Sequence, residues 1–245
     1  MKEFDDALLD ILRGFGNQSP WWRGVDAPWP LVPGLYWRSL ADAEVSMNTR
    51  FRDMAMSRYP QCPSPTDLFG WLSLLQHYRL PTRLLDWSES PLVGLFFALK
   101  ASGAASGEDA VLWALLPTEL SRAEIPGRTA IISSQSSDIA SLLHNAFFRD
   151  GPSDARILSV SPPQVELRHM VQQSVFTLHG RETPIDALPG ADSFLAQIRI
   201  PVTAKLGFSQ MLSLYGVSQA SLFPDLDNLA QELATLRYRP IEEDG

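Results

Sequence analysis

The sequence predicts an α+β fold for this chain of 245 residues. Apolar residues recur at helical spacing near both ends of the chain. Between them, continuous apolar runs such as residues 110–117 (AVLWALLP) have the length and composition of buried strands. A chain of this length can bury a substantial core, either as one mixed domain or as two smaller domains.

The first hundred residues are predicted to be mainly helical. A helix is expected at the start, ended by Gly14 and Gly16, because apolar residues recur there every three or four positions. Four prolines within residues 17–38 exclude one long helix, so a short strand and turns are expected. Residues 41–58 and 65–78 suit two further helices. The apolar residues of the first helix are Phe4, Leu8, Ile11, Leu12 and Phe15.

Strands alternate with helices from residue 82 onward. Residues 82–87 (TRLLDW) predict a short strand, and residues 90–102 predict a buried helix closed by Gly103. After a surface loop at 104–109, strands are expected at 110–117, 174–180 and 194–201. The pattern of residues 117–160 favours no particular element. The last helix is expected at 223–239, with Pro224 in its first turn and Leu226, Leu229, Leu233 and Leu236 on one face.

Composition excludes several classes of protein. The sequence has a single cysteine, Cys62, and therefore neither an internal disulfide nor a cysteine-rich metal site. It has no run of about 18 apolar residues, so no membrane span is expected. Its first residues carry acids where a signal peptide carries positive charge, so a cytoplasmic protein is expected. The net charge of −8 disfavours nucleic-acid binding through a broad, positively charged surface.

Common catalytic motifs are missing from the sequence. GxGxxG, GxxxxGK[ST], HExxH and GxSxG do not occur, which disfavours dinucleotide-fold redox enzymes, P-loop enzymes, zincins and nucleophile-elbow hydrolases. The four histidines share no metal-ligand spacing on one helix face, so no metal is expected. The chemistry must come from dispersed polar residues in segments that otherwise look buried, where such residues need partners or a ligand.

Several segments resemble the FRG domain family, in the family's order. They are WRG (22–24), LVPGLYWR (31–38), LQHYRLPTRLLDWSESPLVGLFFA (75–98), RHMVQQSVFTLHG (168–180) and GVSQASLFPDLDNLA (216–230). The resemblance implies a single FRG domain over residues 20–245, with residues 1–19 as an N-terminal helix packed on it. The family's aromatic residue before Arg-Gly is Trp22 here. Arg79 and Ser174 stand where the family usually has glycine, and an arginine adopts glycine's backbone conformations only at a cost.

The order of the predicted elements is also similar to that of ADP-ribosyltransferases. This second resemblance implies two small sheets, flanked by helices, that meet at a cleft holding NAD as substrate. Carried over to this sequence, Arg23, with Gly24 beside it, would hold the NAD phosphates or the nicotinamide ribose. Ser88 would line the cleft on the second strand, and His77, Tyr78 and Arg83 would surround the rest of the ligand.

Cleavage of the bond to nicotinamide calls for a carboxylate, because positive charge develops on the ribose in the transition state. In the superfamily this group is usually a glutamate just before the late strand. Gln172 lies close to that place here, with Glu166 a few residues earlier. If Gln172 faces the cleft, the carboxylate must come from Glu166 or Asp86, or the protein binds a nucleotide without cleaving it. Asp225 is a further candidate.

Structural roles are alternatives for several of these residues. Arg23 could cap carbonyl groups in a glycine-rich turn. Arg83 and Asp86 are three positions apart and could form a local ion pair. Four aromatic residues are more typical of a core than of a base-stacking platform: Trp87, Phe96, Phe97 and Trp113.

Three functions from different classes follow. The first is an enzyme that transfers ADP-ribose from NAD to an acceptor or hydrolyses NAD, as the toxin of a toxin–antitoxin or anti-phage defence system would. The second is a non-catalytic nucleotide sensor, and the third is a protein interaction domain whose polar residues form a core network. The expected partners of the enzyme are a nucleotide ligand, an antitoxin or defence-system protein, and nucleic acid only as the acceptor.

Overall fold

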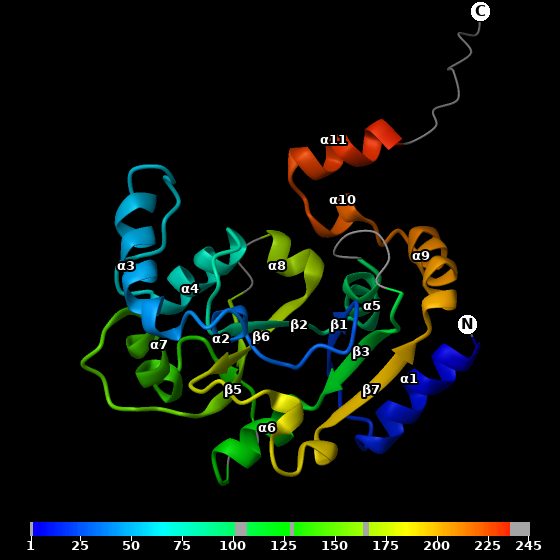
Figure 1. The fold of residues 1–245 in the computed structure, drawn as a ribbon, viewed down its shortest axis with the longest axis horizontal. Helices are drawn as coiled ribbons and strands as arrows, with labels where there is room; N and C mark the ends of the chain where they lie inside the picture. Colours follow the sequence, from blue (N-terminus) through cyan, green and yellow to red (C-terminus); the bar gives the residue numbers. More distant parts are fainter. Residues whose placement is uncertain (1, 101–106, 128–129, 164–166, 236–245) are drawn as a thin grey trace, which may run out of the picture.

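A computed structural model describes residues 2–100, 107–127, 130–163 and 167–235. The predicted α+β class is confirmed: helices flank a seven-stranded sheet in the order β4-β5-β6-β2-β1-β3-β7 (Figure 1). Neighbouring strands pair antiparallel, except β4 and β5, which are parallel. The strands are β1 Trp21–Val25, β2 Leu84–Ser88, β3 Ala110–Leu115, β4 Ile132–Ser133, β5 Ile157–Ser161, β6 Ser174–His179 and β7 Leu195–Ile200.

Five of the described α-helices lie where the apolar periodicity places them, near the N-terminus and within residues 41–58, 65–78, 90–102 and 223–239. The α-helices are α1 Lys2–Gly14, α2 Gly34–Trp37, α3 Glu44–Ala55, α4 Leu68–His77, α5 Pro91–Leu99, α6 Pro117–Glu124, α7 Ala140–Phe147, α8 Leu167–Gln172, α9 Lys205–Leu214, α10 Gln219–Leu222 and α11 Leu226–Thr235. Short 3-10 turns are η1 Ala41–Ala43, η2 Ser137–Ile139, η3 Ile185–Ala187, η4 Ala191–Ser193 and η5 Val202–Ala204. The predicted helix end at Gly103 and the residue Leu236 lie outside the described residues.

A small apolar cluster packs Val93 of α5 against Leu222 and Phe223, and two large clusters form the rest of the core. The larger of these two joins β1, β3 and β7 to α1 and α5, and the other packs α3, α4 and α7 on β2, β5 and β6. The N-terminal helix belongs to the larger cluster through Phe4, whose ring meets the ring of Phe208 edge-on at 5.1 Å between centroids. Residues 2–14 therefore pack on the rest of the fold.

Helix α5 lies directly on β1 because two glycines let the backbones approach. A Cβ atom on Gly24 would stand 1.9 Å from the backbone oxygen of Gly94, and one on Gly94 would stand 2.8 Å from Leu112. The helix begins at a proline in its first turn, where a missing N–H costs nothing, and Ser90 caps it by accepting from the Val93 N–H. The strand-to-helix turn after β2 is thereby fixed.

The C-terminal helix exposes its apolar face. Leu226 is 81% exposed, and Leu229 and Leu233 are 43% and 42% exposed. The helix begins at Leu226 instead of at the predicted Phe223, because the Asp225 side chain accepts from the Asn228 N–H at 2.8 Å and acts as the cap. None of the described helices is long and apolar enough to cross a membrane.

Candidate functional site

The sheet is almost divided between β1 and β2. All residues of these two strands are described, and Trp22 and Ser88 are the one pair that joins them. Continuing that antiparallel register would set Gly24 opposite Asp86, but the strands have separated there. Both strands stay fully paired on their other sides, β1 with β3 and β2 with β6. A gap therefore opens in the middle of the sheet.

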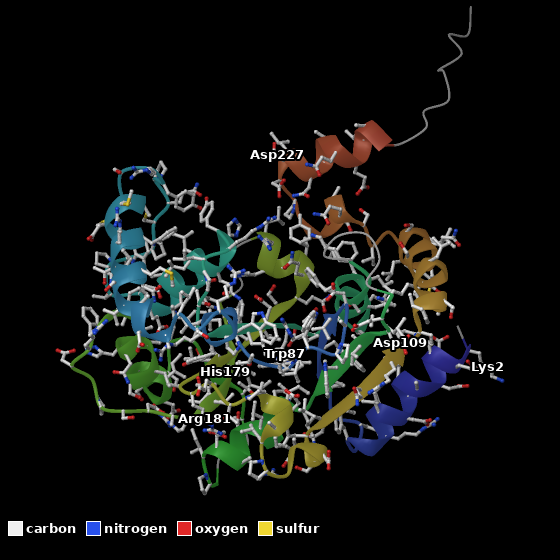
Figure 2. The ribbon with its side chains drawn as sticks, viewed as in Figure 1. Lys2, Trp87, Asp109, His179, Arg181 and Asp227 are labelled. Carbon is white, nitrogen blue, oxygen red and sulfur yellow. The ribbon has the colours of Figure 1, made fainter. Side chains whose placement is uncertain are left out.

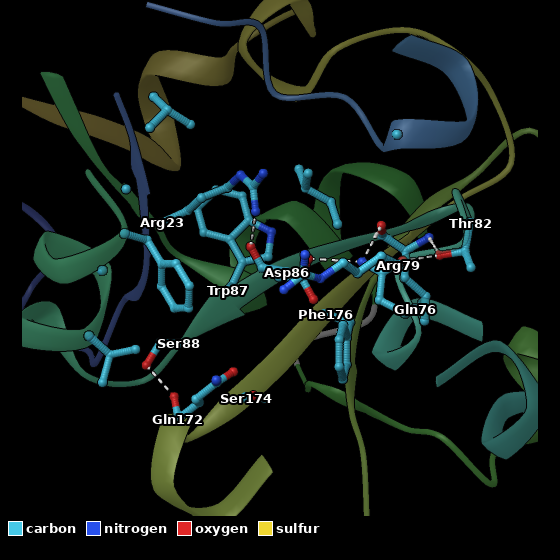
Figure 3. A pocket seen from close by; sticks show the side chains of 18 of the residues that line it. Arg23, Gln76, Arg79, Thr82, Asp86, Trp87, Ser88, Gln172, Ser174 and Phe176 are labelled. Carbon is cyan, nitrogen blue, oxygen red and sulfur yellow. Dashed lines mark hydrogen bonds between the residues drawn. The ribbon is translucent and has the colours of Figure 1, made fainter. Parts of the chain in front are cut away.

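Side chains replace the missing strand partners along this gap. The Arg83 carbonyl faces β6, where it accepts from the His179 N–H, so the carbonyls of Leu84 and Asp86 face β1. The Arg23 guanidinium crosses the gap and donates to the Asp86 backbone oxygen at 2.7 Å (Figure 3). The Gln76 amide donates to the Leu84 oxygen at 3.4 Å. The gap is thus stabilised by hydrogen bonds that a continuous sheet would not need.

A cavity of about 760 Å³ lies over the gap. Its volume is in the range of small-molecule sites. Residues from β1, α4, β2, α5, α8 and β6 line it, together with Trp29 and Trp37 at the exposed edge. Of the residues predicted from sequence, it brings together Arg23, Gly24, His77, Asp86, Ser88 and Gln172.

Asp86 presents a carboxylate to the cavity in a fixed position. Its side chain is exposed there and accepts from the Gln76 amide nitrogen at 2.8 Å. The Thr82 hydroxyl donates to the Gln76 amide oxygen, which orients the amide so that its nitrogen faces Asp86 (Figure 3). Sequence reasoning missed Gln76 and Thr82. The available signal was their place beside His77 and Arg83 in the densest polar segment.

Arg23 supplies a fixed positive charge opposite that carboxylate. Burial lowers the pKa of the Arg23 guanidinium, and the negative charge of Asp86 partly offsets this effect. An arginine stays protonated even so, because its ordinary pKa is far above neutral. The cavity therefore has a cation on β1 and an anion on β2, one on each side of the gap.

Ser88 and Gln172 contribute hydrogen bonds within the protein. The Ser88 hydroxyl donates to the Gln172 backbone oxygen at 2.7 Å and accepts from the Ser90 N–H (Figure 3). The Gln172 amide donates to the Leu222 carbonyl at 2.8 Å. These bonds tie β2 to the end of α8, and α8 to α10, so both residues form the wall of the cavity.

Two predicted site residues lie outside the cavity. Tyr78 points toward α3, where its ring lies 6.4 Å from Phe51 and 6.1 Å from Tyr59. Arg83 is buried and pairs with Glu44, so the local pair of Arg83 with Asp86 does not form.

Of the other two candidate carboxylates, Asp225 is described, and it does not line the cavity. Asp225 caps α11. Glu166 lies outside the described residues, so its position is not assigned. Within the described ranges, no three His, Cys, Asp or Glu side chains gather in a way that could hold a metal ion.

A buried hydrogen-bonded chain lies next to the gap, in the middle of the molecule (Figure 2). The Trp87 indole donates to the Thr177 hydroxyl oxygen at 3.1 Å, and that oxygen lies 2.9 Å from Nε2 of His179. Nδ1 of His179, which is fully buried, has no hydrogen-bond partner among the described residues. Protonation would place a charge and an unpartnered donor in the core.

His179 should therefore make the protein less stable in mild acid. Burial, with the positive charges of Arg181, Arg23 and Arg83, lowers its pKa from 6.5 to about 3. Between these values the unfolded state binds more protons, so stability is present above pH 6.5 and is lost as the pH falls toward 3. We expect urea unfolding to show a loss of up to about 1.4 kcal/mol per pH unit between about pH 6 and pH 5.

The matched variants are His179→Asn and His144→Asn. The first should flatten the dependence on pH, whereas the second, at a half-exposed site on α7, should keep it. An unchanged slope in His179→Asn would assign the effect to other groups.

Comparison with known proteins finds a family match in the first half of the chain. Residues 18–106 match the family model described as the FRG domain. The matched range contains Arg23 on β1 and Asp86 on β2, which lie on the two sides of the gap. It also contains Gln76, whose amide donates to the Asp86 carboxylate. No curated protein and no solved structure matches the chain. Residues 18–106 of the chain are therefore similar to the FRG domain.

Proposed function

We propose that the chain binds NAD in the cavity over the sheet gap, cleaves its bond to nicotinamide and transfers ADP-ribose to an acceptor. The observation that carries the proposal is the gap itself. Two half-sheets joined at Trp22 and Ser88, with a cavity above them, resemble the two small sheets between which ADP-ribosyltransferases hold NAD. The predicted NAD-binding residue Arg23 and the predicted carboxylate Asp86 lie on the two sides of that gap.

The residues of the gap suit each step of the reaction. The planar Arg23 guanidinium can bind a phosphate or a ribose oxygen with two parallel donors. When the glycosidic bond breaks, nicotinamide leaves with the electron pair and positive charge develops on the ribose carbon. The Asp86 carboxylate, held by Gln76, would stabilise that charge. The acceptor then bonds to the same carbon and loses a proton.

Release of nicotinamide from NAD is the direct test. We expect purified protein incubated with NAD to release nicotinamide, and the rate to rise when the right acceptor is added. A toxin or anti-phage defence effector with this chemistry would consume cellular NAD or modify a cellular target. NAD binding without any nicotinamide release, across protein and nucleic-acid acceptors, would support the nucleotide sensor instead. The amide of Gln172 at the end of α8, in place of a carboxylate, is the observation that favours this alternative.

A further inference from the structure

Three cations from three separate elements gather at the helical side of the cavity. Arg79 follows α4, Lys100 follows α5 and Arg168 lies in α8, and all three line the cavity. These helices lie on the same side of the sheet (Figure 1). The cluster is separate from Arg23, which lies in the gap of the sheet and donates to the Asp86 backbone.

Lys100 is close enough to Arg79 and to Arg168 to be repelled by both positive charges. The pKa of Lys100 is lowered, first by desolvation and then by the positive charges of Arg79 and Arg168. The ring of Phe223 holds two of the cations in place, with the Lys100 ammonium 4.3 Å and the Arg168 guanidinium 4.7 Å from its centroid. Hydrogen bonds from Asn228, and to a smaller extent the positive charge of Arg168, lower the pKa of the Asp225 carboxylate. The protein as a whole carries a net charge of −8, so this cluster runs against its overall charge.

Arg79 occupies a strained backbone position. Its φ of 63° is in the left-handed region, where glycine is favoured. It follows Tyr78, the C-cap residue of α4, and the N–H groups of Arg79 and Leu80 donate back to the carbonyls of Gln76 and Leu75. This is the helix ending in which glycine is usual. The Arg79 side chain lines the cavity (Figure 3). A functional role of its positive charge in the cavity would explain why an arginine occupies this strained backbone position.

We propose that Arg79, Lys100 and Arg168 form a subsite for a phosphate group of the ligand. A doubly or multiply charged phosphate would offset the repulsion among the three cations and accept hydrogen bonds from each. Two sources have this chemistry: the diphosphate of a dinucleotide and the phosphodiester of a nucleic-acid acceptor. The phosphate subsite is inferred from the cluster of cations alone. Only the source of the phosphate depends on the proposed function.

Arg79→Gly is the sharpest test, because it removes the charge and relaxes the backbone at the same time. We expect it to lower the affinity for inorganic pyrophosphate about tenfold or more, measured by calorimetry at low salt, while its thermal midpoint stays equal or rises. Lys100→Met and Arg168→Gln should lower the affinity in the same direction. Arg13→Gln, which removes an exposed cation on α1, is the control and should bind pyrophosphate as the wild type does.

The same variants distinguish the two sources. If the affinity for NAD falls with that for pyrophosphate, the subsite holds the diphosphate of the dinucleotide. If NAD binding is unchanged and binding of a short single-stranded oligonucleotide falls, it holds a phosphate of the acceptor. Wild-type affinity for pyrophosphate in all three variants, or no pyrophosphate binding by the wild type, would overturn the subsite. Absence of nicotinamide release with the affinity losses present would overturn the proposed activity and leave the subsite standing.

Discussion

Replacing Asp86 with asparagine is expected to lower the rate of nicotinamide release by about a hundredfold or more while NAD still binds. Asparagine has nearly the same shape as aspartate and can keep the hydrogen bond to Gln76, so the fold and the cavity should be retained. The carboxylate charge acts on the transition state, where the ribose becomes positive. Its loss should therefore lower turnover much more than affinity. Nicotinamide release at saturating NAD, with binding measured separately, checks this.

Asp26→Asn is the matched control, because Asp26 is the other carboxylate among the described residues that line the cavity. Its side chain accepts from the indole of the exposed Trp29 at 3.0 Å. Turnover in this variant should stay within about threefold of the wild type. If Asp86→Asn keeps full turnover and Glu166→Gln loses it, the carboxylate role belongs to Glu166.

Local patterns in the sequence predicted five of the seven described strands but only five of the eleven described α-helices. The two strands β4 and β5 were missed because they are short: β4 has two residues, and ILSVS, the sequence of β5, is too short an apolar run to separate strand from helix. The segment that contains them also holds α6 and α7, whose apolar residues are interrupted by polar ones. Periodicity needs more turns than these helices have.

The site was predicted in part, through residues that share a motif. Arg23, His77 and Asp86 line one cavity although β1 and β2 are far apart in the sequence, and the family resemblance supplied that grouping. The weaker resemblance implied two small sheets that meet at a cleft, whereas the structure has one seven-stranded sheet with a gap between β1 and β2. No local pattern in the sequence indicates where two strands separate. Tyr78 was included for its place next to His77, yet neighbouring residues at a helix end point in different directions.

The ion pair of Arg83 shows why the spacing of Arg83 and Asp86 in the sequence suggested the wrong partner. Residues three positions apart can pair on a helix. Arg83, however, directly precedes β2 and Asp86 lies within it, and in an extended strand side chains an odd number of positions apart point to opposite faces. Arg83 therefore faces α3 and α7 while Asp86 faces the cavity. Its partner Glu44 is 39 residues away, a distance over which no short-range pattern operates.

Breaking this buried pair should have the largest effect on stability. Arg83 is 7% exposed and Glu44 is 3% exposed. The Arg83 guanidinium donates to Oε1 of Glu44 at 2.7 Å, to Oε2 of the same carboxylate, and to the Leu142 carbonyl at 3.0 Å. Arg83→Met would leave the Glu44 carboxylate buried without its counter-charge. We expect the free energy of unfolding in urea to fall by about 3–5 kcal/mol.

A double variant separates the pair from the packing around it. Arg83→Met combined with Glu44→Leu removes both charges, so it should be more stable than the sum of the single changes predicts. Arg122→Met breaks a surface pair with Glu119 and should cost at most about 1 kcal/mol. If Arg83→Met is no more harmful than Arg122→Met, the buried pair does not stabilise the fold.

Because Arg83 directly precedes β2 and its carbonyl accepts from His179, loss of the pair should also loosen the strand that carries Asp86. Nicotinamide release in Arg83→Met should then fall together with stability, in contrast to Asp86→Asn, in which stability is kept.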